Sequence, residues 1–196
     1  MPRWSSPKAK PHDHPPNRLA PRATARRMAV VALSEGVQGV KSPHPSATLS
    51  DMQDWAASIM ARAPDFVIGN DYLRRWWVIP RNPFCNVYLH EILHSDDDRA
   101  LHDHPWANTS VLLSGGYIEH TPEGVFERKA GDVVSREADA LHRLEVMPGQ
   151  PALSLFITGP TIREWGFACP KGWVHWTDFV APHDKGQVGR GCGEHT

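Results

Sequence analysis

The stretch Leu101–Trp106, with the sequence LHDHPW, is the most informative part of the chain. His102 and His104 are two residues apart, so on an extended chain both side chains point to the same face, about 6 to 7 Å apart along the strand. Two imidazoles at that separation can converge on one metal ion through bonds of about 2 Å. Taken alone, a His-x-His pair is a weak signal, because most such pairs in histidine-rich chains bind no metal. The residues that follow the pair therefore decide how it is interpreted.

A second stretch, Gly131–His142 (GDVVSREADALH), strengthens the metal interpretation. Together the two stretches resemble the motifs of the cupin superfamily, in which a His-x-His pair is followed by a Glu and a Gly, and later by a Gly-Asp and a third His. The residues that fit these motifs are His102, His104, Gly116, Gly131, Asp132 and His142. The resemblance implies an all-β fold, the cupin double-stranded β-helix or jelly-roll barrel. It also implies one divalent metal ion held by His102, His104 and His142.

The departures from the cupin motifs shape the expected metal site. Motif positions with other residues are Asp96 and Asp139 in place of Gly, and Glu137 in place of Pro. Thr109 stands where the metal-binding Glu is expected, with Asn108 beside it. Threonine is a poor ligand, so the expected site has three histidines and open positions for water, substrate or oxygen, unless a carboxylate such as Glu91 completes it. Such a site suits Fe(II), Zn(II), Ni(II) or Cu(II), and Mn(II) is a further possibility.

Within the cupins, the chain resembles the three-histidine thiol dioxygenases of the cysteine dioxygenase kind, which often carry His-Asp-His as the first pair. These enzymes bind the substrate carboxylate with an arginine upstream of the pair, and the guanidinium fork suits that task. The arginines available upstream are Arg74, Arg75 and Arg81. The match is incomplete, because Phe156 and Thr158 stand where the animal enzymes have a His-x-Tyr pair. The resemblance implies a mononuclear non-heme Fe(II) dioxygenase acting on a small substrate that bears a thiol or a carboxylate.

Four further residues are candidates for the catalytic site. Tyr88 and His90 alternate along one strand, and their shared face could be the barrel interior, where either would serve as a hydrogen-bond donor or a general base. Arg74 or Arg75 would hold an anionic substrate. The simpler alternatives are that Tyr88 and His90 only pack in the core and that the arginines form a solvated face.

The rest of the chain is organised around one barrel domain. Residues 1–47 are expected to be a disordered basic leader, 48–182 the cupin domain, and 183–196 a flexible tail. Apolar residues at helical spacing predict one helix that begins with Ser50 as cap and Gln53 in a capping box, ends before Pro64, and packs outside the sheet. About eight short β-like runs follow, from Tyr72 to Cys169. The aromatic run 163–180 is expected to be a structural lid, the wall of a pocket or a dimer surface.

The composition narrows the class of protein further. The 196 residues carry a net charge of −1, which argues against general affinity for nucleic acid. Three cysteines, Cys85, Cys169 and Cys192, are widely spaced, so they predict no disulfide framework and favour a reducing, cytoplasmic setting. The expected partners are a small-molecule substrate and a second copy of the chain. Two other functions stay open: a Zn(II)-, Ni(II)- or Mn(II)-dependent isomerase or hydrolase, and a cupin that binds a small molecule without turnover.

Overall fold

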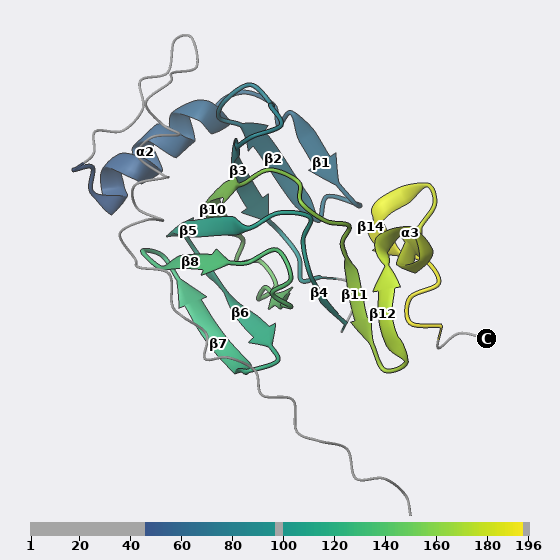
Figure 1. Cartoon of the computed structure of the whole chain (residues 1–196). Coiled ribbons are helices and arrows are strands. Elements are labelled where there is room, and N and C mark those ends of the chain that lie inside the picture. The colour runs from purple at the N-terminus through teal and green to yellow at the C-terminus, as the bar shows by residue number, and fades with distance from the viewer. Residues whose placement is uncertain (1–45, 97–99, 194–196) are drawn as a thin grey trace, which may run out of the picture.

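Strands dominate the part of the chain that the computed structural model describes, residues 46–96 and 100–193 (Figure 1). The helices are α2 (Leu49–Met60) and α3 (Trp176–Phe179). The strands are β1 (Phe66–Ile68), β2 (Leu73–Trp77), β3 (Asn86–Ile92), β4 (Leu101–His102), β5 (Asn108–Ser114), β6 (Gly116–Thr121), β7 (Gly124–Lys129), β8 (Val133–Arg136), β9 (Arg143–Glu145), β10 (Ala152–Thr158), β11 (Gly166–Cys169), β12 (Gly172–His175), β13 (Val180–Ala181) and β14 (Asp184–Val188). The predicted leader lies outside the described residues up to position 45.

The strands form two facing sheets. The first has six antiparallel strands in the order β1-β2-β3-β10-β5-β8. The second consists of two three-stranded parts, β12-β11-β4 and β7-β6-β9, which an isolated antiparallel bridge between His102 and His142 joins edge to edge. This strand order, in which strands far apart in sequence lie side by side, is that of a double-stranded β-helix. The predicted fold class is therefore confirmed.

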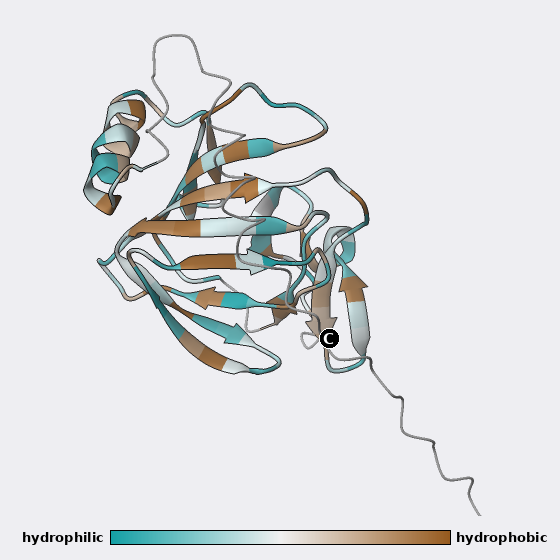
Figure 2. Cartoon of the chain, turned by 60° about the vertical axis from the view of Figure 1, so that its left-hand side comes forward, coloured by the Kyte–Doolittle hydropathy of each residue, from teal (hydrophilic) through white to brown (hydrophobic). Residues whose placement is uncertain are grey.

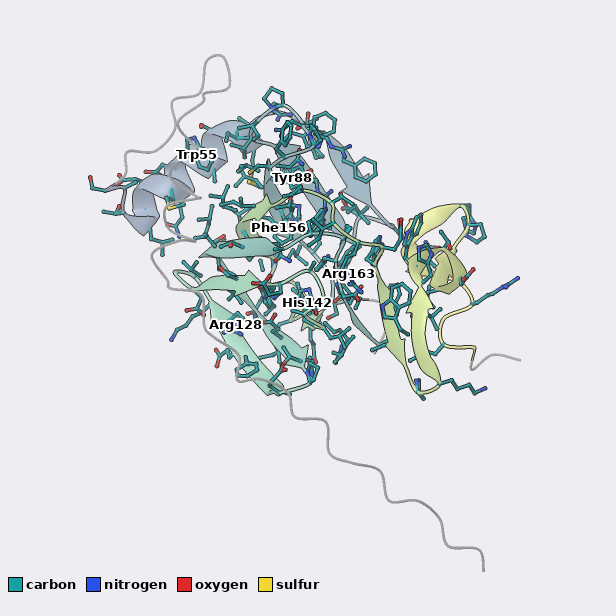
Figure 3. The ribbon with its side chains drawn as sticks, viewed as in Figure 1. Trp55, Tyr88, Arg128, His142, Phe156 and Arg163 are labelled. Carbon is teal, nitrogen blue, oxygen red and sulfur yellow. A yellow bond between two sulfur atoms is a disulfide. The ribbon has the colours of Figure 1, made fainter. Side chains whose placement is uncertain are left out.

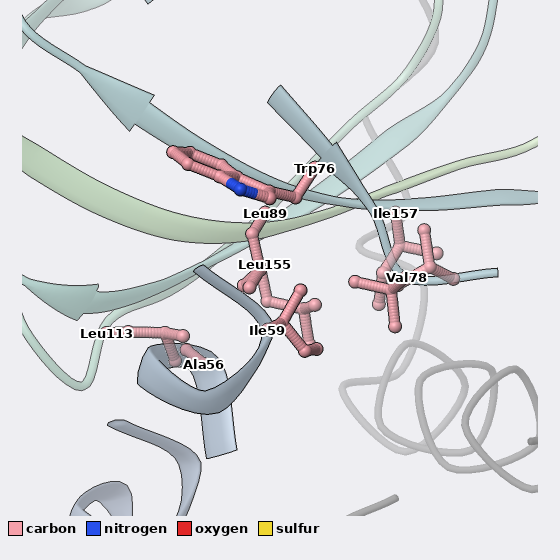
Figure 4. Packing of buried hydrophobic residues seen from close by; sticks show 9 residues of the cluster. Ala56, Ile59, Trp76, Val78, Leu89, Leu113, Leu155 and Ile157 are labelled. Carbon is pink, nitrogen blue, oxygen red and sulfur yellow. The ribbon is translucent and has the colours of Figure 1, made fainter. Parts of the chain in front are cut away.

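Helix α2 covers the outer face of the six-stranded sheet. Ala56 and Ile59 are buried against Trp76, Leu89, Leu113 and Leu155, which point outward from four neighbouring strands (Figure 4). The side-chain amide of Gln53 donates a hydrogen bond to the Leu113 carbonyl oxygen at 2.6 Å and fixes the helix to β5.

The start of α2 differs from the prediction by two residues. Thr48 is the N-cap: its hydroxyl accepts from the Asp51 backbone N–H, and the Asp51 side chain accepts from the Thr48 backbone N–H in return. Thr-x-x-Asp satisfies two donors at the helix start just as the predicted Ser50 and Gln53 would have done. Thr48 rather than Ser50 therefore caps the helix. The side chain of Gln53 is left free to donate its hydrogen bond to the backbone of β5.

The inner face of the six-stranded sheet, which looks toward the second sheet, changes character along the barrel. At one end it is apolar, where Leu73, Ile92 and Leu112 pack with Tyr117 and Val146. Toward the other end the strands carry polar and aromatic residues instead; these include Arg75, Tyr88, His90, Asn108, Ser154, Phe156 and Thr158. The strands accordingly alternate between hydrophobic and hydrophilic residues (Figure 2). One half of the barrel is a core, and the other half can hold a site.

The C-terminal segment is better ordered than its composition predicts. Instead of a flexible tail, residues 184–188 form β14, which pairs with β13. Phe167, Phe179 and Val180 form a small core there with Trp165 and Trp176 around it. This arrangement bears out the interpretation of the aromatic run as structural.

A disulfide joins Cys169, at the end of β11, to Cys192. The prediction that the cysteines stay unpaired is wrong for these two, because hairpin β11–β12 and strand β14 bring together residues that are 23 positions apart. Cys85 remains free and half-buried. Since disulfides persist mainly in oxidising compartments, the cysteine content no longer favours a reducing setting. Within the described residues, no helix is long and apolar enough to cross a membrane.

Candidate metal centre

His102 and His142 are held side by side by the backbone. Each donates its backbone N–H to the other's carbonyl oxygen at 2.9 Å, and this bridge joins the two halves of the second sheet. Residues directly opposite each other in an antiparallel pair project their side chains to the same face. The imidazole centroids are accordingly 4.8 Å apart. In the sequence, His102 belongs to the first cupin-like motif and His142 to the second. The backbone bridge between them brings the two motifs together.

His104 completes the group from the loop after β4. Its backbone N–H donates to the Ala138 carbonyl oxygen at 3.0 Å, which turns its side chain toward the other two histidines. The His104 and His142 Nε2 atoms are 2.9 Å apart, and one ring nitrogen of each of the three histidines lies within 4.8 Å of the others. Nitrogen ligands at right angles on bonds of about 2.1 Å would lie about 3 Å apart, so the His104–His142 pair already has the spacing of two ligands on one ion, and His102 lies close enough to join them after a small side-chain adjustment. Among the described residues, this is the one cluster of histidine, cysteine and carboxylate side chains with that spacing.

A buried carboxylate stands behind His142. Glu119, on β6, is 1 % exposed, and its Oε1 accepts from His142 Nδ1 at 3.1 Å. A metal-binding histidine commonly donates its second ring N–H to a carboxylate, which fixes the tautomer and the ring orientation. With Nδ1 used in this way, His142 presents Nε2 to a metal.

Glu119 is itself held by two arginines. Arg136 Nε on β8 and Arg128 Nε on β7 each donate to one of its oxygens at 2.7 Å. The ion pair with Arg136 reaches from one sheet to the other, and both of its side chains are buried. Glu119 was not among the sequence candidates. Its position in the sequence is the signal that could have identified it. Glu119 follows Tyr117 by two residues on the same strand, so this charged side chain shares the inward face of Tyr117.

The protonation states suit a metal site. Burial lowers the pKa of His142 to about 4, and burial lowers that of His104 well below its ordinary value, with the other histidines adding to the effect. Burial alone would raise the pKa of Glu119, but the hydrogen bond from His142 and the charge of Arg136 outweigh it and hold that pKa at about 2. At neutral pH, neutral imidazoles therefore face an ionised carboxylate, as metal ligation requires.

Two acidic residues of the motif region have structural roles. Asp96 Oδ2 accepts from the Leu144 backbone N–H at 2.7 Å and lies 3.8 Å from His102 Nδ1. Asp103, between the two histidines of the first pair, points the opposite way. It accepts from the Gly166 backbone N–H and from Trp173 Nε1, which ties the β11–β12 hairpin to β4.

The predicted catalytic candidates divide between the two faces of the first sheet. Arg75, Tyr88 and His90 lie together on the inner face. Arg75 Nε donates to His90 Nε2 at 2.8 Å, and the Arg75 guanidinium lies 4.6 Å from the centre of the Tyr88 ring. Arg74 points to the other face, where it forms ion pairs with Asp71 and Glu91. Glu91 is therefore engaged there and is not a member of the histidine group.

An aromatic wall connects these residues with the histidines. His90 stacks on Phe156 at 4.7 Å between ring centroids, and Phe156 lies 6.4 Å from His104. Trp106 stacks on the outer side of His104 at 4.8 Å. In Figure 3, Phe156 lies between Tyr88 and His142. The candidate residues of the first sheet therefore face the same interior as the metal group.

The register at the position of the missing glutamate differs from the prediction by one residue. Asn108, which is 4 % exposed, occupies the inner face, whereas Thr109 points outward and shares a hydrogen bond with Ser135 at 2.9 Å. Because side chains alternate along a strand, the residue that replaces the motif Glu is Asn108. Its amide has no hydrogen-bond partner among the described residues. The site thus has a neutral amide, not a carboxylate, at this position.

The strand order gives the chain the double-stranded β-helix fold, which is the fold of the cupins, and three histidines gather at the junction of its second sheet. No protein-family model matches the sequence, and neither does any curated protein. Among solved structures it is similar to the dimethylsulfoniopropionate (DMSP) lyase DddQ of Ruegeria pomeroyi, with 14% identity over 83% of each chain and a TM-score of 0.49.

Two other solved structures are also similar. A conserved protein of Klebsiella pneumoniae with a double-stranded β-helix domain is 21% identical over 50% of this chain and 86% of that one, with a TM-score of 0.41. A cupin-2 domain protein of Rhodospirillum rubrum is 13% identical over 52% of this chain and 68% of that one, with a TM-score of 0.44. The strand order and the histidine bridge of this chain identify its fold.

Proposed function

We propose that the protein is a mononuclear non-heme Fe(II) dioxygenase that acts on a small acid, with thiol-bearing acids as the first candidates. The observation that carries this proposal is the make-up of the metal group. It has three histidines and, among the described residues, no carboxylate at metal-binding distance from them. Three neutral ligands leave the charge of a divalent ion uncompensated, which favours the binding of an anionic substrate beside it. Bound Fe(II) would supply the one-electron and oxygen chemistry that protein side chains lack.

Arg75 is the residue best placed to bind a substrate carboxylate. It lies on the inner face, and no carboxylate of residues 46–96 or 100–193 forms an ion pair with it. A half-buried guanidinium without a carboxylate partner is costly unless a ligand supplies one. Its Nε donates to His90, so the terminal nitrogens remain available for a bidentate contact.

His90 and Tyr88 would position this arginine and manage protons. Burial, with the charge of Arg75 adding to it, lowers the pKa of His90 well below its ordinary value, so the ring is neutral and its Nε2 can accept from Arg75. The Tyr88 ring supports the guanidinium through a cation–π contact. The Phe156 and Trp106 rings lie 6.4 and 4.8 Å from the His104 ring and would shield the space beside the histidines.

Oxygen uptake tests the proposal. Protein loaded with Fe(II) without air should consume oxygen when cysteine or 3-mercaptopropionate is added, as an oxygen electrode would record. The Arg75→Gln variant should raise KM at least about tenfold, because a charge-assisted bidentate contact is lost. The matched control is Arg74→Gln, whose side chain points to the opposite face and whose KM should stay at the wild-type value.

Two results would count against the proposal. If loaded protein takes up no oxygen with any thiol acid, the dioxygenase assignment is wrong. If turnover of an acid proceeds without air, with Zn(II), Ni(II) or Mn(II) in place of iron, the site is that of an isomerase or a hydrolase, and Tyr88 and His90 become its candidate acid and base.

A further inference from the structure

A cavity of about 380 Å³ opens at the polar end of the barrel. Its wall includes Arg81, Asn86, Tyr88, Trp106, Gly159 and Thr161. Trp106 faces this cavity and also stacks on His104 at 4.8 Å between ring centroids. Trp106 therefore connects the cavity wall with the histidine group.

The charge at the wall of this cavity is positive. Arg81 contributes a guanidinium that forms no ion pair with a described residue and whose central carbon lies 5.8 Å from the centre of the Trp77 ring. The cavity wall contains no carboxylate. A second guanidinium, that of Arg75, lies behind the Tyr88 ring. Burial lowers the pKa of Arg75, and the charge of Arg81 contributes to lowering it further. A region with two cations and no counter-ion attracts anions.

Tyr88 supplies an independent indication of a ligand. The residue is only 5 % exposed, it lines the cavity, and its hydroxyl forms no hydrogen bond with a described residue. A tyrosine hydroxyl at a cavity wall can donate a hydrogen bond to a ligand that enters the cavity. The asparagines of the same wall do not supply one, since Asn82 and Asn86 are bonded to each other and to the 80–86 turn.

We propose that this cavity is a subsite for a planar organic anion, whose negative group binds Arg81 and the Tyr88 hydroxyl and whose flat body lies against Trp106. Binding at the subsite does not depend on the metal. That the bound group is part of the substrate does rest on the proposed function. In that case the substrate extends beyond a simple thiol acid and carries an anionic, planar portion toward the barrel mouth.

Calorimetric titration of the full chain with benzoate and with its neutral analogue benzamide tests the subsite. Benzoate should bind at least about tenfold more tightly than benzamide, because benzamide cannot form the charge-assisted contact. The Arg81→Gln variant should weaken benzoate binding about tenfold, and Tyr88→Phe about fivefold or more. Both changes keep the fold, since Arg81 is exposed and phenylalanine preserves the buried ring. The control Arg190→Gln removes an exposed arginine that does not line the cavity and should leave the affinity unchanged.

The titration is repeated after treatment with a chelator, which separates the subsite from the metal. Equal benzoate affinity with and without chelator is expected. Loss of binding on chelation would place benzoate on the metal and overturn the subsite, as would equal affinities for benzoate and benzamide or an unaffected Arg81→Gln variant. A protein that binds benzoate as predicted but holds no metal would refute the proposed function and leave the subsite standing.

Discussion

Replacing Glu119 with alanine is expected to lower the free energy of unfolding by about 3 to 5 kcal/mol, because the change strands a buried positive charge. Arg136 is 9 % exposed, and Glu119 is its ion-pair partner. Arg128 and His142 also lose their hydrogen bonds to the same carboxylate. Urea denaturation with the metal removed by chelator would measure the loss.

The matched control for this change is Glu145→Ala on the neighbouring strand β9. Glu145 is 46% exposed and pairs with His120 at the surface, so its removal should cost less than about 1 kcal/mol. Similar losses for the two variants would contradict the role given to Glu119. The Glu119→Ala protein, where it folds, should also bind metal about 10- to 100-fold more weakly, since it no longer orients His142.

The same network predicts how stability depends on pH. The pKa of Glu119 is held at about 2, below its ordinary 4.5, so its contribution is complete above pH 4.5 and is lost as the pH falls toward 2. The pKa of His142 is lowered from 6.5 to about 4, so its contribution is likewise lost as the pH falls through that range. The metal-free protein should therefore lose stability steadily on acidification, and Glu119→Ala should flatten the decline at the acid end.

Replacing His104 with alanine is expected to weaken metal binding by well over 100-fold, more than removal of an outer hydrogen-bond partner does. His104 contributes one of three nitrogens, and its ring has few other polar contacts than that with His142. Competition between the protein and a chelating dye for Zn(II) would give the affinity. Metal should also raise the melting temperature of the wild type and have little effect on that of the variant.

His120→Ala is the matched control for the loss of His104. His120 lies on β6, pairs with Glu145 and is outside the metal group, so its removal should leave the Zn(II) affinity unchanged. Equal affinities of the wild type and the His104→Ala variant would mean that the three histidines do not form the site. A loss in both variants would indicate nonspecific binding by a histidine-rich chain.

The barrel and the metal group could be predicted because their determinants are local and periodic. His102 and His104 lie two apart on an extended segment, and His142 follows a turn and a strand at the spacing typical of the family. The short β-like runs likewise predict most of the strands. None of these signals requires knowledge of which strands pair.

The features that the sequence did not predict depend on strand register and on the pairing of strands that are far apart in the chain. A shift of one residue exchanges the two faces of a strand, and this decides between Asn108 and Thr109 and between Arg74 and Arg75. The role of Glu119 depends on β6 lying beside β9 and facing β8. The Cys169–Cys192 disulfide depends on a strand, β14, that composition alone had assigned to a tail.

The metal content of the intact chain tests the central claim most directly. The full-length protein would be loaded with Fe(II) without air, freed of unbound metal by gel filtration and analysed by mass spectrometry for metal per chain. The account predicts about one iron per chain, bound by His102, His104 and His142. Protein that retains no iron, and no Zn(II), Ni(II) or Mn(II) in its place, would contradict it.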